Sequence, residues 1–197
     1  MERNRHMSKI IDIMALYTPD CHRSMPGREI ARKLGINHQT ALNSLNELVK
    51  RKILAFEVRG RNKEYGINLS NSASRILLEM AEQKKALELT ENTGIKIVIE
   101  EMIPFAETII VFGSFANKTY NEKSDIDLLV LGKCDMKELI KIKKRHTREI
   151  NIEAVGFDEF YNYLNKRKAL ALEVAKNHAV FGNVSRFMNI LWKFYQR

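Results

Sequence analysis

The sequence has only two cysteines, Cys21 and Cys134, and they lie far apart with no Cys-x-x-Cys pair. This spacing argues against both a disulfide framework and a cysteine-based zinc site. No stretch holds the roughly 18 uncharged apolar residues of a membrane-spanning helix, and the amino terminus has no apolar run of the signal-peptide type. Internal repeats and low-complexity tracts are also absent. We therefore expect a cytoplasmic protein that does not associate with membranes.

The composition indicates a globular protein with a basic surface. The chain has 197 residues, of which 45 % are hydrophobic, which is enough to form one large core or two small ones. We prefer two small domains. The formal net charge of +9 favours polyanionic partners such as nucleic acid or a nucleoside triphosphate.

The first third of the chain has the pattern of three helices followed by a hairpin. Gly35 suits the left-handed position that ends a helix, and Asn37 suits the cap of the next one. The turn between the two strands has the basic sequence RGRNK. The predicted elements are a helix within residues 10–16, a helix from Pro26, a helix from about His38 to Lys52, and strands at Ile53 to Val58 and Glu64 to Leu69.

This order of elements resembles the winged helix-turn-helix family of DNA-binding domains over residues 8–70. The resemblance implies that the third helix enters the major groove and that the basic turn contacts phosphate or the minor groove of double-stranded DNA. The alternatives are an ordinary solvated helix face and a charged hairpin tip that deters edge pairing. The residues predicted to bind DNA are Gln39, Thr40, Asn43, Arg59, Arg61 and Lys63.

A linker helix is predicted next, within residues 71–93 and running from about Ser72 to Leu89. Its apolar residues pack either between the two halves of the chain or between the subunits of a homodimer. Asn92-Thr93-Gly94 marks the boundary to a second domain over 94–197. There, helices, including one from Met136 to Arg148, alternate with strands near 108–112, 126–131 and 150–155. Helices dominate to the end, and the segment ALALEVAKNHAVF is predicted to be one of them. This pattern predicts an α/β (α+β) fold with a small mixed sheet and C-terminal helices.

Two aspartates interrupt an otherwise apolar strand in the stretch IIVFGSFANKTYNEKSDIDLLVLG. Because side chains alternate along a strand, Asp125 and Asp127 project to the same side. Two converging carboxylates repel each other unless a cation lies between them, and magnesium suits such oxygen ligands together with substrate phosphates. Gly113 and Ser114 close the preceding strand and open a helix, where free backbone N–H groups favour a phosphate. The alternative is a strand end whose carboxylates face water.

The Gly-Ser turn, the ten-residue gap and the Asp-Ile-Asp motif resemble the nucleotidyltransferase superfamily related to DNA polymerase beta, and within it the minimal nucleotidyltransferases. The resemblance covers roughly Gly94 to Val155. It implies a Mg2+ or Mn2+ cofactor and a third carboxylate on a later strand. Glu153 is the candidate for this carboxylate, and in a competing register Asn151, on the same face of the strand, takes its place. The implied catalytic and metal-binding residues are Asp125, Asp127 and Glu153, and the implied nucleotide-binding residues are Gly113, Ser114, Lys118 and Ser124.

The family often has an arginine shortly after the Gly-Ser pair, where this chain has Asn117 and Lys118, and more often has aspartate as the third carboxylate. The resemblance implies adenylyl transfer from ATP to a hydroxyl group of a protein or nucleic acid. Many minimal nucleotidyltransferases act as antitoxins, so a toxin-like partner protein is also implied. The alternative is a transcription regulator whose second half senses nucleotide or mediates dimerisation without catalysis.

Overall fold

The computed structural model describes residues 2–197, with side chains described from Met7 onward. The chain divides into two compact units, one formed by the residues up to Ala81 with Tyr195–Arg197, the other by Glu82–Phe194. The division falls within the long helix α4 (Ser72–Leu89), and each unit is described by itself. Among the described helices, none combines the length and apolarity needed to cross a membrane.

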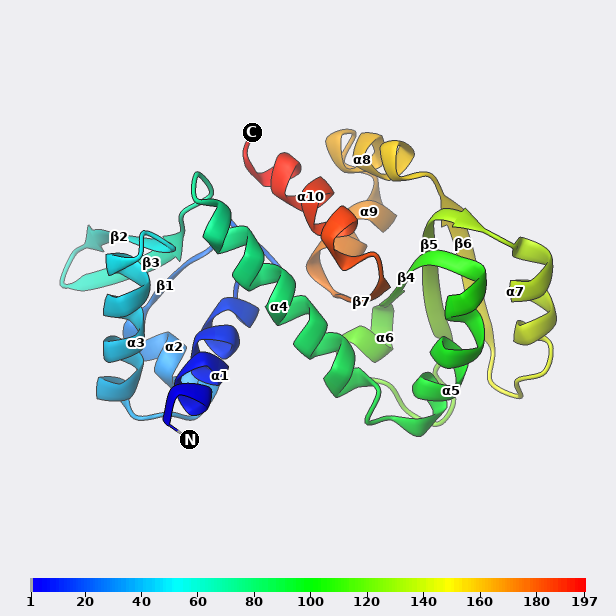
Figure 1. The fold of residues 1–197 in the computed structure, drawn as a ribbon, viewed down its shortest axis with the longest axis horizontal. Helices are drawn as coiled ribbons and strands as arrows, with labels where there is room; N and C mark the ends of the chain where they lie inside the picture. The colour runs from blue at the N-terminus through cyan, green and yellow to red at the C-terminus, as the bar shows by residue number, and fades with distance from the viewer. Residues whose placement is uncertain (1) are drawn as a thin grey trace. The chain divides into compact units, whose positions relative to one another are not determined.

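Besides the first part of α4, the described residues of the first unit form three helices and a three-stranded antiparallel sheet in the order β1-β3-β2. Its core includes Ile13, Ile30, Leu45 and Leu48, all fully buried. Figure 1 shows this unit at the blue and cyan end of the chain. The elements are α1 (Glu2–Ala15), β1 (Ser24–Pro26), α2 (Gly27–Leu34), α3 (His38–Lys50), β2 (Leu54–Arg59) and β3 (Asn62–Ile67).

Helix termini in this unit follow the local signals. Gly35 ends α2 with φ 62°, a conformation that costs glycine little. The Asn37 side chain accepts a hydrogen bond of 2.7 Å from the backbone N–H of Gln39 and so caps α3. The strand β1 was not predicted, because three residues are too few to produce a recognisable alternation.

The second unit is built on a four-stranded mixed sheet in the order β6-β5-β4-β7. β5 and β6 are parallel, whereas β4 is antiparallel to both of its neighbours, β5 and β7. This mixed α and β architecture agrees with the predicted fold class. The strands are β4 (Ala106–Phe112), β5 (Ile126–Cys134), β6 (Ile150–Val155) and β7 (His178–Gly182).

Helices surround this sheet, and α5 and α7 lie beside it in Figure 1. Buried side chains of α5 and α7 join Ile109, Val111 and Leu128 of the sheet in one apolar cluster. α8 contacts β5 and α9 contacts β4. The helical elements after α4 are α5 (Thr93–Met102), the 3-10 turn η1 (Ile103–Phe105), α6 (Gly113–Ala116), α7 (Met136–Lys143), α8 (Phe157–Asn165), α9 (Ala169–Lys176) and α10 (Val184–Tyr195).

Two predictions about this unit were wrong. The segment ALALEVAKNHAVF was predicted to be one helix, but the chain leaves α9 at Lys176 and forms β7 from His178. A short apolar run fits a buried strand as well as a helix, and only the pairing with β4 decides between them. The helix predicted from Met136 to Arg148 ends at Lys143, and Arg145 and His146 instead contact Glu101 of α5.

Candidate active site

The predicted glycine and aspartate meet at one edge of the sheet. Since β4 and β5 are antiparallel, the end of β4 lies beside the start of β5, and Phe112 pairs with Asp127. Gly113 follows with φ 64°, and a Cβ atom there would lie 2.5 Å from Oδ2 of Asp127. The carboxylate of Asp127 therefore packs directly on the backbone of Gly113, and a side chain at position 113 would displace it.

The residue beside Asp127 on the next strand is Asn151. The parallel register pairs these two residues, and Asn151 Nδ2 donates a hydrogen bond of 3.1 Å to Asp127 Oδ1. Glu153 pairs with Leu129, two residues further along the strand. Between Met7 and Arg197, no three His, Cys, Asp or Glu side chains are grouped so as to share a metal ion.

Asp125 lies just before β5 and is exposed at the end of a loop, residues 117–125. Arg148 Nη1 holds this loop by donating to the carbonyl oxygens of Asn121, at 3.1 Å, and Ser124, at 2.5 Å. The guanidinium also lies 5.4 Å from the ring centroid of Phe115. Sequence reasoning missed Arg148, because it belongs to a basic run that reads as a solvated surface.

Two of the other predicted nucleotide-binding side chains make local contacts. Lys118 Nζ lies 3.3 Å from Glu88 Oε2. Ser124 Oγ accepts a hydrogen bond of 2.8 Å from the backbone N–H of Asn121. The structure thus brings Gly113, Asp127 and Asn151 together, while Lys118 pairs with Glu88 and Ser124 accepts a backbone hydrogen bond within the loop.

The carboxylate oxygens at this edge suit one cation, and they do not form a cluster of three carboxylates. Magnesium is commonly held by one or two carboxylates together with substrate phosphates. Asp125 and Asp127 can provide the carboxylates. Asn151 presents a hydrogen-bond donor to Asp127, so it does not supply the third carboxylate that the sequence prediction placed at this edge.

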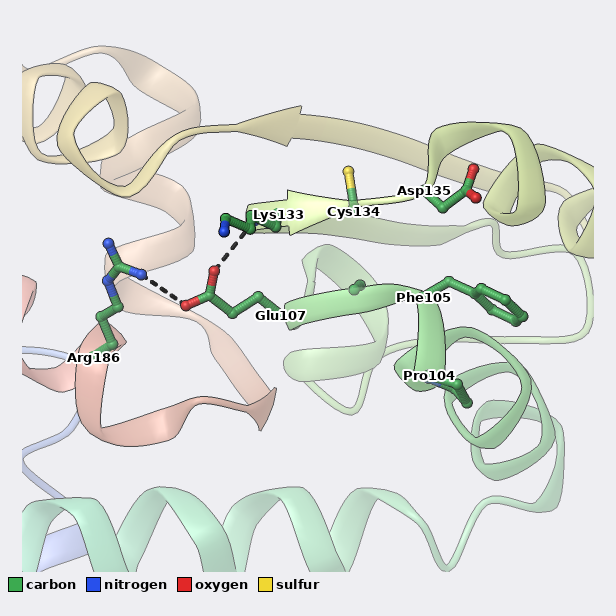
Figure 2. Close-up of a pocket in the computed structure, with 8 residues that line it drawn as sticks. Pro104, Phe105, Glu107, Lys133, Cys134, Asp135 and Arg186 are labelled. Carbon is green, nitrogen blue, oxygen red and sulfur yellow. Dashed lines mark hydrogen bonds and ion pairs between the residues drawn. The ribbon is translucent and has the colours of Figure 1, made fainter.

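A separate pocket lies at the opposite end of β4 and β5 (Figure 2). Its central carboxylate, Glu107, accepts hydrogen bonds from the backbone N–H of Lys133 and from Arg186, and both lower its pKa. A Cβ atom on Gly132 would collide with Glu107 Oε2. These contacts hold an irregular strand pairing at the start of β4. We therefore assign Glu107 and Arg186 a structural role.

The first unit presents a second candidate surface. A cavity of about 220 Å³ lies between α2, α3 and the β2–β3 turn. In the described part of the chain no acidic side chain pairs with Arg28, Arg61 or Lys63. Arg59 differs, because Glu57 and Glu64 lie 3.3 and 3.5 Å from its guanidinium. The cavity is lined by Pro26, Gly27, Arg28, His38, Leu42, Arg61, Asn62, Lys63 and Tyr65.

The remaining predicted DNA-binding side chains lie on α3. Gln39 and Asn43 are exposed and hydrogen-bonded to each other, with Gln39 Nε2 donating to Asn43 Oδ1 at 3.0 Å. Thr40 is partly exposed beside them. Lys63 lies 4.4 Å from the ring centroid of Phe56, which orients its ammonium group across the hairpin.

A family model described as the nucleotidyltransferase domain matches residues 94–189. The match includes the edge at which Gly113, Asp127 and Asn151 meet. It supports the nucleotidyltransferase part of the sequence prediction and, at a general level, a function in nucleotidyl transfer. No curated protein and no solved structure gives a significant match.

Proposed function

We propose that the second unit binds a magnesium–nucleoside triphosphate and transfers its nucleotidyl group to a hydroxyl group. The observation that carries the proposal is the packing of the Asp127 carboxylate on Gly113 within the segment that matches the nucleotidyltransferase domain. ATP is the nucleotide we propose, and a protein or nucleic-acid hydroxyl is the acceptor. A toxin-like partner protein is one such acceptor.

Each residue at the edge has a role in this proposal. Asp125 and Asp127 hold the cation, while the backbone at Gly113 and the Ser114 hydroxyl bind the terminal phosphates. A cation held there would supply the positive charge that offsets the triphosphate and the departing pyrophosphate. Arg148 is a positioning residue, because it fixes the loop that presents Asp125. Lys118 remains a candidate for phosphate binding once it separates from Glu88.

Calorimetric titration tests the binding step. We expect a non-hydrolysable ATP analogue to give saturable heat in the presence of Mg2+ or Mn2+ and none in excess EDTA. The reason is that a bare triphosphate would meet the two aspartates as like charges. Equal binding with and without the divalent cation would contradict a metal-dependent site.

We propose as a second function that the first unit binds double-stranded DNA. Its three helices and its sheet order β1-β3-β2 support the winged helix-turn-helix resemblance. The basic cavity supports contact with phosphates, since Arg28 and Arg61 have no acidic partner among the described residues. In this arrangement Gln39, Thr40 and Asn43 face base edges, and the hairpin follows the backbone.

Removing either arginine of the cavity should weaken binding to any duplex. We expect Arg28→Ala and Arg61→Ala each to reduce the slope of log affinity against log salt by about 1, because each arginine neutralises one phosphate. Arg59→Ala is the matched control and should change the slope less, since Glu57 and Glu64 already compensate that charge. Fluorescence anisotropy of a labelled duplex at several salt concentrations measures this. Equal effects of all three substitutions would exclude the cavity as the phosphate contact.

A further inference from the structure

We propose that Asn151 restricts the site to one divalent cation, the one that the triphosphate carries. This inference rests on the proposed nucleotide-binding function. Two-cation phosphoryl-transfer sites place the ions about 3.5–4 Å apart, and the second ion requires further anionic ligands. Here the strand neighbour of Asp127 is an amide, and the parallel register leaves no choice about which β6 residue occupies that place.

The orientation of the amide follows from its partner. A carboxylate can only accept hydrogen bonds, so the N–H end of Asn151 faces Asp127, and the reverse orientation would set two acceptors against each other. The observed bond of 3.1 Å occupies one lone pair of Asp127 Oδ1. Donor hydrogens therefore point at the carboxylate that a second cation would have to share.

Glu153 does not replace the missing carboxylate. It lies two residues beyond Asn151 on the same face of β6, a displacement of about 6.6 Å along the strand. Its neighbour across the ladder is the buried apolar side chain of Leu129. From Met7 to the end of the chain, no third His, Cys, Asp or Glu completes a metal cluster with the aspartates.

A single cation would hold the nucleotide without activating the acceptor. Asp125 and Asp127 would anchor the metal–triphosphate, but no second cation would lower the pKa of the acceptor hydroxyl, so we expect transfer to be slower than at a two-cation site. Asn151→Asp would place a carboxylate directly beside Asp127, and the repulsion between the two would be relieved by an additional cation. This one substitution is therefore expected to open the second metal position.

Counting manganese ions tests the inference without relying on activity. Mn2+ is titrated into the full-length protein with one equivalent of a non-hydrolysable ATP analogue, and free Mn2+ is measured by electron paramagnetic resonance. Radiolabelled analogue in equilibrium dialysis confirms that nucleotide is bound. We expect the wild type to take up no Mn2+ beyond the ion held by the nucleotide alone, Asn151→Asp to take up one more per chain, and the control Asn151→Ala none.

The possible outcomes are distinct. An additional ion in the wild type overturns the inference, and its loss in Glu153→Gln would identify Glu153 as the ligand. Failure of a folded Asn151→Asp protein to gain an ion also overturns it. If circular dichroism shows that Asn151→Asp does not fold, the numbers of Mn2+ ions bound by the wild type and by Glu153→Gln still show whether the wild-type site holds a second ion. Absence of nucleotide binding in the wild type overturns the proposed function itself, and the inference with it.

Discussion

Asp127→Asn should lower the affinity for magnesium–ATP by about 100-fold and abolish nucleotidyl transfer. A carboxylate contributes a few kcal/mol to holding a cation near a protein surface, and the amide removes that charge without changing the shape of the side chain. The fold should be retained, because the amide oxygen of the substituted side chain can still accept the hydrogen bond from Asn151 Nδ2. Calorimetry measures the affinity, and transfer of label from α-labelled ATP measures the reaction.

Asp135→Asn is a matched control for this prediction. Asp135 follows the opposite end of β5 and caps α7 by accepting hydrogen bonds from the backbone N–H groups of Lys137 and Glu138. Asparagine caps helices equally well, so this change removes the same charge just beyond the other end of β5 without loss of structure. The control should bind magnesium–ATP like the wild type. Unchanged binding by Asp127→Asn would remove the aspartate from the site, and equal losses in both variants would indicate a general charge effect.

The sequence carried enough information to predict the local geometry of this edge. Gly113 directly follows β4 and Asp127 belongs to β5, two strands that are consecutive in the chain and joined only by α6 and a short loop, so their proximity depends on a short stretch of sequence. The caps at Gly35 and Asn37 were predictable for the same reason, because each depends on neighbours within a few residues.

The register of β6 was not predictable in this way. Alternation along the strand places Asn151 and Glu153 on the same face, so the pattern alone cannot choose between them. The choice depends on pairing with β5, about 24 residues away in the chain, which sets Asn151 beside Asp127. Arg148 and Arg28 were missed on similar grounds, because an arginine in a basic sequence gives no sign of the loop or cavity that it meets.

A buried ion pair lies beside β4 in the second unit. Glu82 of α4 and His178 of β7 are both fully buried, with Glu82 Oε1 3.0 Å from His178 Nε2. His178 Nδ1 lies 2.7 Å from the carbonyl oxygen of Val174, which can only accept, so Nδ1 carries a proton. Nε2 must then also be protonated to interact favourably with the carboxylate. The imidazole is therefore cationic when Glu82 is ionised.

The charge of this pair makes stability depend on pH. Burial by itself would raise the pKa of Glu82, but His178 and Lys85 outweigh burial and hold the pKa below its ordinary value of 4.5. Because the folded state has the lower pKa, the contribution of Glu82 is present above about pH 4.5 and is lost as the pH falls below it.

His178→Leu should lower the free energy of unfolding by about 3–5 kcal/mol, because it leaves a buried carboxylate with Lys85 as its remaining cationic partner. The double variant Glu82→Leu/His178→Leu should regain most of this loss and show a weaker decline in stability below pH 4.5. Urea denaturation followed by the fluorescence of Trp192, the single tryptophan, reports on this unit. A single variant that loses less than about 1 kcal/mol, or a double variant no more stable than the single, would show that the pair is not ionised in the folded protein.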